Sequence, residues 1–195
     1  GDAAVIRTSD RHTVVVDAGG VPDWQREEWR RPERPYDPGE RVVLSFLRHE
    51  GVRRLDALIL THSDADHMKG ALALLDSGIR IRRLILNGSP EAEKALLQRE
   101  IIEKAHQRRI PVQTVVAGQV WPLGDQVALQ WLNPSPQTRQ LPNENDASIV
   151  FVMHAFGKQV LFGGDVEEAG ERAMLESDWG WRDVDILKVA HHGSN

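Results

Sequence analysis

The 195-residue sequence contains no cysteine. This absence excludes disulfide bonds, zinc sites with thiolate ligands and cysteine nucleophiles. The sequence also lacks an apolar run of about 18 residues, the length at which a helix crosses a membrane, and nothing at its start has the pattern of a signal peptide. We therefore expect no direct membrane insertion by this segment.

Positive charge is in short supply as well. The chain has 24 lysines and arginines against 29 aspartates and glutamates, a formal net charge of −5. Such a surface does not attract nucleic acid as a whole, so a polyanion would need a local basic patch or bound metal. A hydrophobic fraction of 41% supports one domain over residues 1–195. Strand-like sequence at the first residues and an abrupt end predict a fragment of a larger protein, truncated at its C-terminus.

Short apolar runs rich in β-branched residues alternate with helical patterns along the chain. Residues 3–8 and 12–20 predict a hairpin, because a short polar turn joins two such runs. Residues 89–109 have the clearest helical pattern, with Ser89 as its cap and Pro90 at its first position. We expect further helices at 41–52, 67–78 and 166–177, and further strands at 55–60, 81–88, 112–118, 127–134, 147–156, 158–165 and 183–190.

This order of elements predicts an α/β fold with two β-sheets packed face to face and helices on their outer faces.

Four ionisable residues follow the apolar run at 55–60, in the segment THSDADH. His62 and Asp64 project to one side of extended chain, because side chains alternate there. Asp66 and His67 come where the chain turns into a helix, so one loop can present ligands to two neighbouring points. One such residue alone would indicate a polar turn or a helix cap; four of them favour a metal site.

Two other predicted strands end in the same kind of residue. Asp165 ends one strand, and His191 and His192 end another, each beside a glycine that lets backbone approach a ligand closely. Taken singly, Asp165 is typical of a helix cap and the histidine pair of a polar surface. Three strand ends of this kind together predict a metal centre.

Several segments together carry a family resemblance. THSDADH resembles the HxHxDH signature of the metallo-β-lactamase fold, with Asp64 in place of the second histidine. The fuller set is similar to the β-lactamase-like domain of ComEC-type DNA-uptake proteins, in that family's order from Gly1 to Asn195: GDAAVIRT, VVVDAGG, LILTHSDADHMKGA, NDASIV, LFGGDVEEAGE and LKVAHHGS.

The resemblance implies an αββα sandwich with a two-metal hydrolytic site and nuclease activity on incoming DNA, degrading the strand that is not transported during natural transformation. It also implies attachment to a polytopic membrane channel in the same polypeptide, with this domain on the extracytoplasmic side of the cell membrane. DNA and other competence proteins are the implied partners.

The resemblance also assigns roles to residues. His62 and Asp64 would bind the first metal, Asp66 and His67 the second, and Asp165 would bridge both. His191 or His192 would complete the second site; we favour His191 as the ligand and His192 as a substrate contact. The predicted catalytic residues are Asp66, Asp165 and His192, and the residues predicted to support the ligands are Asp17, Asn145 and Ser148.

The sequence departs from the family at the first metal. The usual third histidine is missing, its region offers Asn145, Asp146 and Ser148, and Lys69 replaces a usual glycine. We therefore expect a first metal that is weakly held or filled only with substrate. Oxygen-rich ligand sets favour harder ions, so two Mn²⁺ ions are predicted, with Zn²⁺ or Mg²⁺ as alternatives.

The segment from Trp24 to Arg41 mixes cationic and aromatic residues. Such residues can track phosphates and stack on bases, or form an ordinary solvated loop, and both interpretations stay open. The predicted DNA contacts are Arg26, Trp29, Arg30, Arg31 and Arg34. The segments RIRRL at 80–84 and QRR at 107–109 are expected to be solvated faces.

Three functions are compatible with these residues. The first is a metal-dependent deoxyribonuclease that uses direct attack by water, since we find no cysteine and no compelling serine nucleophile. The second is a small-molecule hydrolase such as a β-lactamase or lactonase, against which Asp64 and LKVAHHGS both count. The third is a domain that binds or gates DNA without cutting it, which the missing third histidine keeps open.

Overall fold

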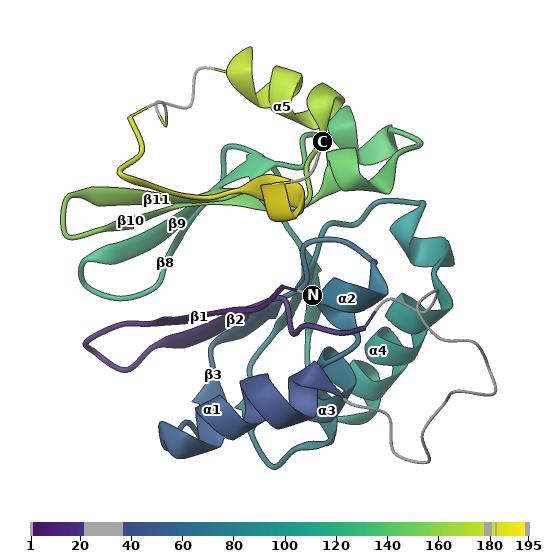
Figure 1. Ribbon diagram of the computed structural model, residues 1–195, viewed down its shortest axis with the longest axis vertical. Helices are drawn as coiled ribbons and strands as arrows, with labels where there is room; N and C mark the ends of the chain where they lie inside the picture. The colour runs from purple at the N-terminus through teal and green to yellow at the C-terminus, as the bar shows by residue number, and fades with distance from the viewer. Residues whose placement is uncertain (1, 22–36, 178–180, 182, 194–195) are drawn as a thin grey trace.

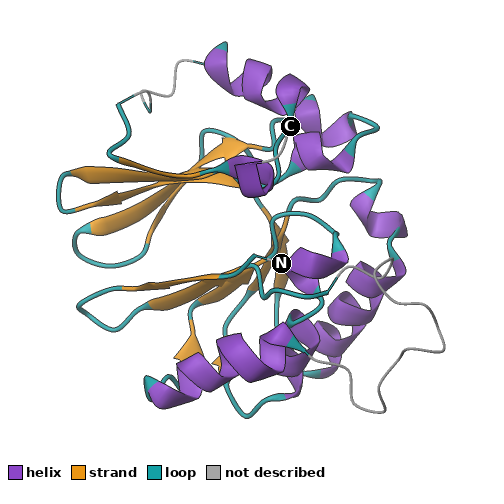
Figure 2. Ribbon diagram, viewed as in Figure 1, coloured by secondary structure: helices purple, strands orange, loops and turns teal. Residues whose placement is uncertain are grey.

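The computed structural model describes residues 2–21, 37–177, 181 and 183–193. Two five-stranded sheets face each other, and helices cover their outer faces (Figures 1 and 2). The predicted α/β sandwich is confirmed. Within the described part of the chain, no helix has the length and hydropathy that crossing a bilayer requires.

The first sheet has the order β1-β2-β4-β6-β7. Its strands are Ala4–Arg7, Thr13–Val16, Ala57–Ile59, Leu84–Leu86 and Val112–Thr114. The hairpin β1–β2 is antiparallel, as predicted, and the other pairs are parallel, so β2, β4, β6 and β7 all end at one edge. Leu58 packs under the outer helices, whereas Ala57 and Ile59 face the second sheet. Burial on both faces explains the continuous apolar run of β4.

The second sheet has the order β12-β11-β10-β9-β8. Its strands, in chain order, are Val120–Pro122, Val127–Asn133, Val150–Ala155, Lys158–Phe162 and Ile186–Lys188. β10 and β11 form an antiparallel hairpin, and β12 pairs in parallel with β11. Phe151 lies in the core between the sheets, stacked on Phe162 at 4.7 Å and edge-on to Trp131 at 5.4 Å between ring centroids. These three rings come from neighbouring strands of the second sheet, and the apolar cluster to which they belong also includes Val14, Val16 and Ile59 of the first sheet.

The helices are shorter and more broken than the sequence pattern indicates. The predicted helix 89–109 is a 3₁₀ turn, Ala92–Lys94, followed by α4, Leu96–Gln107, because Ala95 is extended (ψ 124°) and interrupts it. The Ser89 hydroxyl accepts from the Glu91 backbone and so caps only the early turn. The remaining helices of the described residues are η3 (Gly39–Leu44), α1 (Ser45–His49), α2 (Ala65–Met68), α3 (Ala71–Asp76), η5 (Thr138–Gln140), η6 (Glu144–Ala147), α5 (Glu168–Leu175) and η7 (Ala190–Gly193).

Two strand predictions also differ from the structure. The strand expected at 112–118 ends at Thr114, and the short strand β8 was not expected. A separate two-stranded sheet pairs β3 (Arg54–Leu55) with β5 (Arg80–Ile81) in parallel. This small sheet precedes β4 and β6 in the chain, at the edge where those strands begin.

Glycines allow three backbone segments to meet beside α2. A Cβ added to Gly70 would lie 2.1 Å from the carbonyl oxygen of Ala18 and 2.6 Å from the Cα of Gly39. A Cβ on Gly20 would lie 1.8 Å from the carbonyl oxygen of Ala65. Contacts this short involve main chain on both sides, so no side-chain rotation relieves them. The end of β2, the start of η3 and the turn between α2 and α3 are therefore fixed against one another.

We predict that Gly70→Ala destabilises the protein by about 2 kcal/mol or more, since an added methyl group would force backbone apart. The backbone of Gly70 (φ −65°) itself suits alanine, so the effect reports only the lack of space. Gly78→Ala is the matched control, because a Cβ at Gly78 meets nothing within 4 Å. Urea unfolding of both variants tests this, and equal midpoints would contradict it.

Candidate metal centre

The polar residues of the centre follow strands that end at the same side of the sandwich. Asp17 follows β2 and His62 follows β4, and these two strands are parallel neighbours. Asp165 follows β11 in the opposite sheet. Because parallel strands deliver their carboxyl ends to one edge, residues far apart in sequence meet there.

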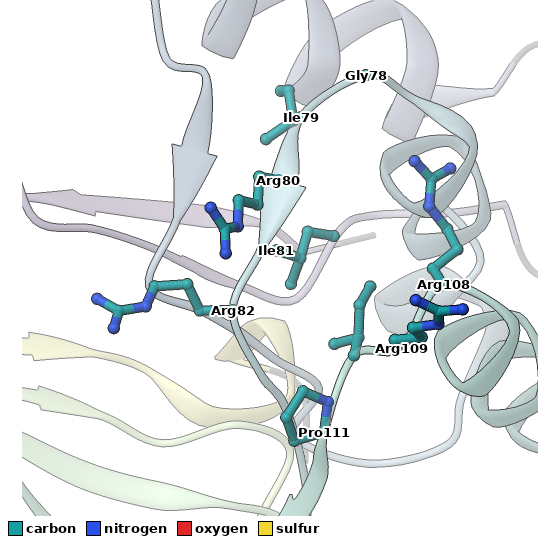
Figure 3. Close-up of a pocket in the computed structure, with 9 residues that line it drawn as sticks. Gly78, Ile79, Arg80, Ile81, Arg82, Arg108, Arg109 and Pro111 are labelled. Carbon is teal, nitrogen blue, oxygen red and sulfur yellow. The ribbon is translucent and has the colours of Figure 1, made fainter.

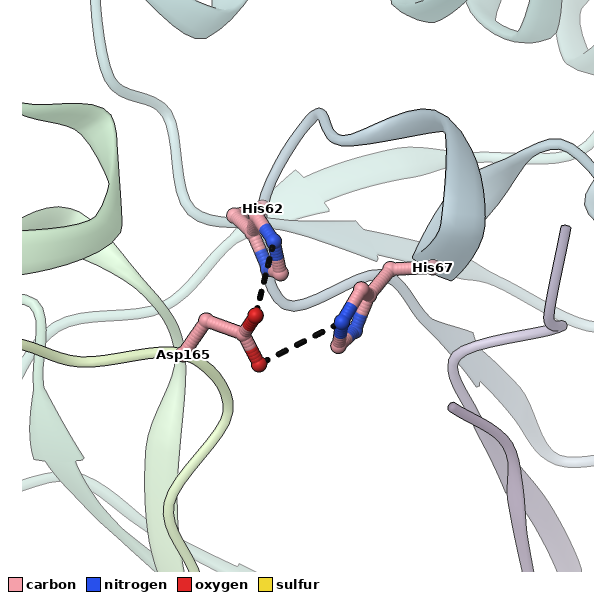
Figure 4. A group of neighbouring side chains, drawn as sticks. All are labelled: His62, His67 and Asp165. Carbon is pink, nitrogen blue, oxygen red and sulfur yellow. Dashed lines mark ion pairs between the residues drawn. The ribbon is translucent and has the colours of Figure 1, made fainter. Parts of the chain in front are cut away.

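Three predicted ligands form a buried cluster. Ligand atoms of His62, His67 and Asp165 all lie within 4.8 Å of one another. The two carboxylate oxygens of Asp165 face different imidazoles: Oδ2 lies 3.8 Å from Nε2 of His62, and Oδ1 lies 3.3 Å from Nε2 of His67 (Figure 4). The residues are 1%, 0% and 3% exposed, respectively. A carboxylate between two imidazoles in this way has the arrangement of a bridging ligand.

Asp17 sets the direction in which both imidazoles face. Its Oδ2 lies 2.9 Å from Nδ1 of His67, which donates to it, and accepts the Thr61 hydroxyl at 2.9 Å. Since that hydroxyl's one proton goes to Asp17, Nδ1 of His62 donates to the Thr61 oxygen, 3.0 Å away. Both rings then carry a proton on Nδ1 and direct Nε2 toward Asp165.

The donor set fits a divalent cation. Within the described part of the chain, Nε2 of His62 has no hydrogen-bond partner although it is buried. A buried polar atom left in this way costs free energy unless something binds it. Imidazole nitrogens with a carboxylate oxygen are ligands that zinc-type and manganese-type ions accept. The cluster has the composition and the burial of a metal site.

His67 has a strongly shifted pKa in the metal-free chain. Burial by itself lowers the pKa of its imidazole, but the carboxylates of Asp165 and Asp17 override this effect and raise the pKa to about 10. A cation that binds Nε2 must displace a proton held there. When no metal is bound, Asp165 and Asp17 therefore favour the protonated imidazole of His67.

Asp64 and Asp66 flank the buried cluster. Oδ2 of Asp64 lies 3.7 Å from Nε2 of His62, and Oδ2 of Asp66 lies 3.9 Å from Nε2 of His67. The Asp64 side chain is 59% exposed and that of Asp66 20% exposed, so both lie on the solvent side of the centre. The neighbouring His62 side chain is the main cause of the lowered pKa of Asp64. The centre thus has a buried imidazole floor and a carboxylate rim.

The segment that replaces the missing third histidine supports other groups. The backbone N–H of Asp165 donates to the hydroxyl of buried Ser148 at 3.4 Å. Asp146 accepts from the backbone of Gly170 at the start of α5, and the Asn145 amide donates to Glu167. None of the three lies in the buried cluster. The hydroxyl of Ser148 thus contacts the backbone of a predicted ligand.

His191 lies apart from the buried cluster. Its Nδ1 is 3.7 Å from Oε1 of Glu167, and its backbone N–H donates to the carbonyl of Gly164 at 3.2 Å. The side chain of His192 lies outside the described residues, and so do all five predicted DNA contacts between positions 26 and 34.

Glu144 is a structural partner of the centre that sequence reasoning missed. Its carboxylate accepts from the backbone of Ser63 at 2.7 Å and from the Ser63 hydroxyl, and it accepts from the amide of Asn87 at 3.1 Å. Glu144 thereby ties the loop between His62 and Asp64 to the segment that precedes β10. No periodicity or spacing in the sequence connects a glutamate at 144 to a serine at 63.

The fold and the buried histidine–carboxylate cluster define an αββα protein with a candidate metal centre where strands of both facing sheets end. The model of the metallo-beta-lactamase superfamily matches residues 1–195, and the chain belongs to this superfamily.

Two curated relatives are similar to this chain. ComE operon protein 3 of Bacillus subtilis (strain 168) is 32% identical over 188 residues, which cover 94% of this chain and 23% of the relative. Competence protein ComA of Neisseria gonorrhoeae is 30% identical over 195 residues, 100% of this chain and 23% of the relative. The chain therefore spans less than a quarter of either protein.

A solved structure supports the fold. CmlA, a diiron β-hydroxylase from Streptomyces venezuelae, superposes with a TM-score of 0.53 at 17% identity, over 95% of this chain and 32% of that one. The resemblance to the metallo-β-lactamase fold and to ComEC-type competence proteins that the sequence motifs predicted is confirmed.

We predict that Asp17→Asn weakens binding of Mn²⁺ or Zn²⁺ by about 10–100-fold, because asparagine has one acceptor oxygen where the two oxygens of Asp17 accept three hydrogen bonds, from the backbone and hydroxyl of Thr61 and from His67. Asp56→Asn is the control, since Asp56 is also buried in this sheet and accepts from the backbone of Thr13 at 3.0 Å. Titration against a competing chelator measures both affinities. A similar loss in the two variants would refute a role specific to Asp17.

Proposed function

We propose that this chain is a metal-dependent deoxyribonuclease that hydrolyses phosphodiester bonds. The observation that carries the proposal is the buried pair of imidazoles, His62 and His67, each of which directs Nε2 to a different oxygen of Asp165. Two similar proteins named for competence support DNA as the substrate. Members of this superfamily are in general metal-dependent hydrolases, which agrees with a hydrolytic centre.

The residues around Asp165 divide into two ligand groups. His62 and Asp64 would hold one cation and His67 and Asp66 the other, with Asp165 common to both. When bound, two divalent ions supply Lewis acidity and a water of lowered pKa. His191 is proposed as a further ligand of the second group, with His192 beside it as a substrate contact.

This chain's own residues prepare and enclose the centre. Asp17 keeps the Nδ1 proton on His67 and, through Thr61, on His62, so both Nε2 atoms face inward. Burial of both rings excludes water from the floor. The exposed rim at Asp64 leaves one open side, by which a phosphodiester reaches the centre. Catalysis then depends on positioning and electrostatics.

Direct attack by water remains the simplest scheme. The sequence has no cysteine, and Ser148 is fully buried with its hydroxyl engaged by the Asp165 backbone. A serine in that position is held as a support and does not reach a substrate. Asp66 and Asp165 are therefore proposed to act on the attacking water as carboxylates beside it.

The wider setting is proposed from the relatives. The domain would belong to a ComEC-type membrane protein, lie on the extracytoplasmic side of the cell membrane, and degrade the strand that is not transported. Its partners would be DNA, the channel portion of the same polypeptide and other competence proteins. The predicted DNA contacts at positions 26 to 34 belong to this proposal.

We predict that His67→Ala and Asp165→Ala each reduce DNA cleavage by about 10³-fold or more, because each removes a ligand from the floor of the centre. The assay follows labelled single- and double-stranded DNA with Mn²⁺, Mg²⁺, Zn²⁺ or chelator. His154→Ala is the control: this half-buried histidine lies in the middle of β10, bonded to Gln130 at 2.8 Å, and its loss should change the rate by less than about twofold.

The same preparations distinguish the competing functions. Hydrolysis of nitrocefin without cleavage of DNA would replace the nuclease by a small-molecule hydrolase. Binding of DNA without cleavage under every metal condition would indicate a domain that only holds DNA.

We predict faster cleavage with Mn²⁺ than with Zn²⁺, by about threefold or more, since carboxylates make up half of the proposed ligands. Reconstitution of chelator-treated protein with each ion at equal free concentration measures this preference. A higher turnover with Zn²⁺ would show that the two imidazoles, and not the carboxylates, decide the choice of ion.

A further inference from the structure

Four arginines line a groove away from the metal centre. The groove, of about 530 Å³, lies between the segment that contains β5 and the end of α4 (Figure 3). Arg80 and Arg82 come from the first wall, and Arg108 and Arg109 come from the second. All four side chains belong to exposed residues, and the isoleucines between them are buried. Two sequence segments that we expected to be separate solvated faces thus form one basic surface.

The neighbouring strand extends this basic surface. β3 pairs in parallel with β5, with Arg54 opposite Arg80, and the backbone of Arg80 donates to the carbonyl of Arg53 at 3.0 Å. Like charges opposite each other across two strands destabilise a sheet. The basic surface therefore has six arginines, although the whole chain has a net charge of −5: Arg53, Arg54, Arg80, Arg82, Arg108 and Arg109.

Carboxylates balance only part of this charge. Among the described residues, Asp56 is the carboxylate that pairs with members of the group, at 3.7 Å from Arg54 and 3.3 Å from Arg82. Arg108 donates to the backbone carbonyls of Leu75 and Ser77. Arg53, Arg80 and Arg109 form no ion pair with any residue that the structure describes. Three exposed guanidinium groups are therefore available to an anion.

The groove and the metal centre lie at opposite edges of the first sheet. β3 and β5 come just before β4 and β6, whereas the metal-centre loop follows β4. Fully extended chain from Arg54 to His62 covers roughly 26 Å.

We propose that this groove binds the phosphate backbone of a nucleic acid at a site separate from the metal centre. Guanidinium groups form paired hydrogen bonds to phosphate oxygens, and several along a groove can follow successive phosphates. An anionic membrane is the less suitable partner, because membrane-binding surfaces add exposed apolar side chains that insert. No such large apolar side chain is exposed on β3, β5 or the end of α4.

The proposal takes its choice of DNA from the proposed function but does not depend on cleavage. Binding at this groove needs no metal, so it is measured in chelator, where the metal centre contributes nothing. If a variant that lacks the groove arginines still cuts DNA normally, the proposed nuclease stands without the groove. If the chain binds DNA through these arginines but does not cut it, the groove stands without the nuclease.

The test compares affinities for a labelled 20-base-pair DNA and for the corresponding single strand by fluorescence anisotropy in chelator. Arg80→Gln with Arg109→Gln should weaken binding about tenfold at low salt and reduce the slope of log Kd against log salt by about 2. Lys158→Gln with Arg172→Gln removes the same charge from exposed positions elsewhere, and should change Kd by less than about twofold.

A charge-conserving variant and a lipid arm complete the test. Arg80→Lys with Arg109→Lys keeps the charge but loses the paired hydrogen bonds, so its Kd should lie between those of the unmodified chain and the glutamine variant, with the salt slope of the unmodified chain. Equal affinities for the glutamine and control variants would overturn the proposal. Binding to phosphatidylglycerol vesicles that the glutamine variant loses, with DNA affinity unchanged, would also overturn it and assign the groove to a membrane surface.

Discussion

The carboxylate of Asp17 is the interaction on which the rest of the centre depends. It lies at the end of β2, accepts from the backbone and hydroxyl of Thr61, and accepts from His67 in the helix beyond. A buried carboxylate is stable only when its oxygens are hydrogen-bonded, so the loop from β4 must close over it. The fold's own need to satisfy this charge therefore places both imidazoles and fixes which nitrogen of each faces the centre.

The second sheet supplies the complementary part. Asp165 would be as costly to bury as Asp17, and its position between two imidazoles offsets that cost. Ser148 and the paired strands β10 and β11 hold its backbone in place. Because one half of the centre comes from each sheet, the aromatic packing of Phe151 between them also sets the spacing of the ligands. A change in the packing between the two sheets would therefore also change the distance between the ligands.

Much of this arrangement could be predicted from sequence, and the limits have physical causes. His62, His67 and Asp165 each come shortly after an apolar run, and this pattern can be read directly from the sequence. It predicted that the three residues lie together at the ends of strands. The break of a long helix at Ala95 and the links made by Glu144 could not be predicted in this way, because tertiary contacts decide them. The arginines of the groove were visible as short basic segments, but only the pairing of β3 with β5 unites them.

The backbone at Asp17 adds a restriction of its own. Its φ is 54°, in the left-handed region that asparagine and aspartate enter more readily than other residues with a side chain. Glycine would satisfy that torsion but carries no acceptor, and glutamate would carry an acceptor but resist the torsion. A residue at position 17 must therefore meet two requirements: it must adopt a positive φ, and it must carry a negatively charged acceptor. Few residue types meet both requirements, even though the Asp17 side chain itself is not proposed to touch a metal or a substrate.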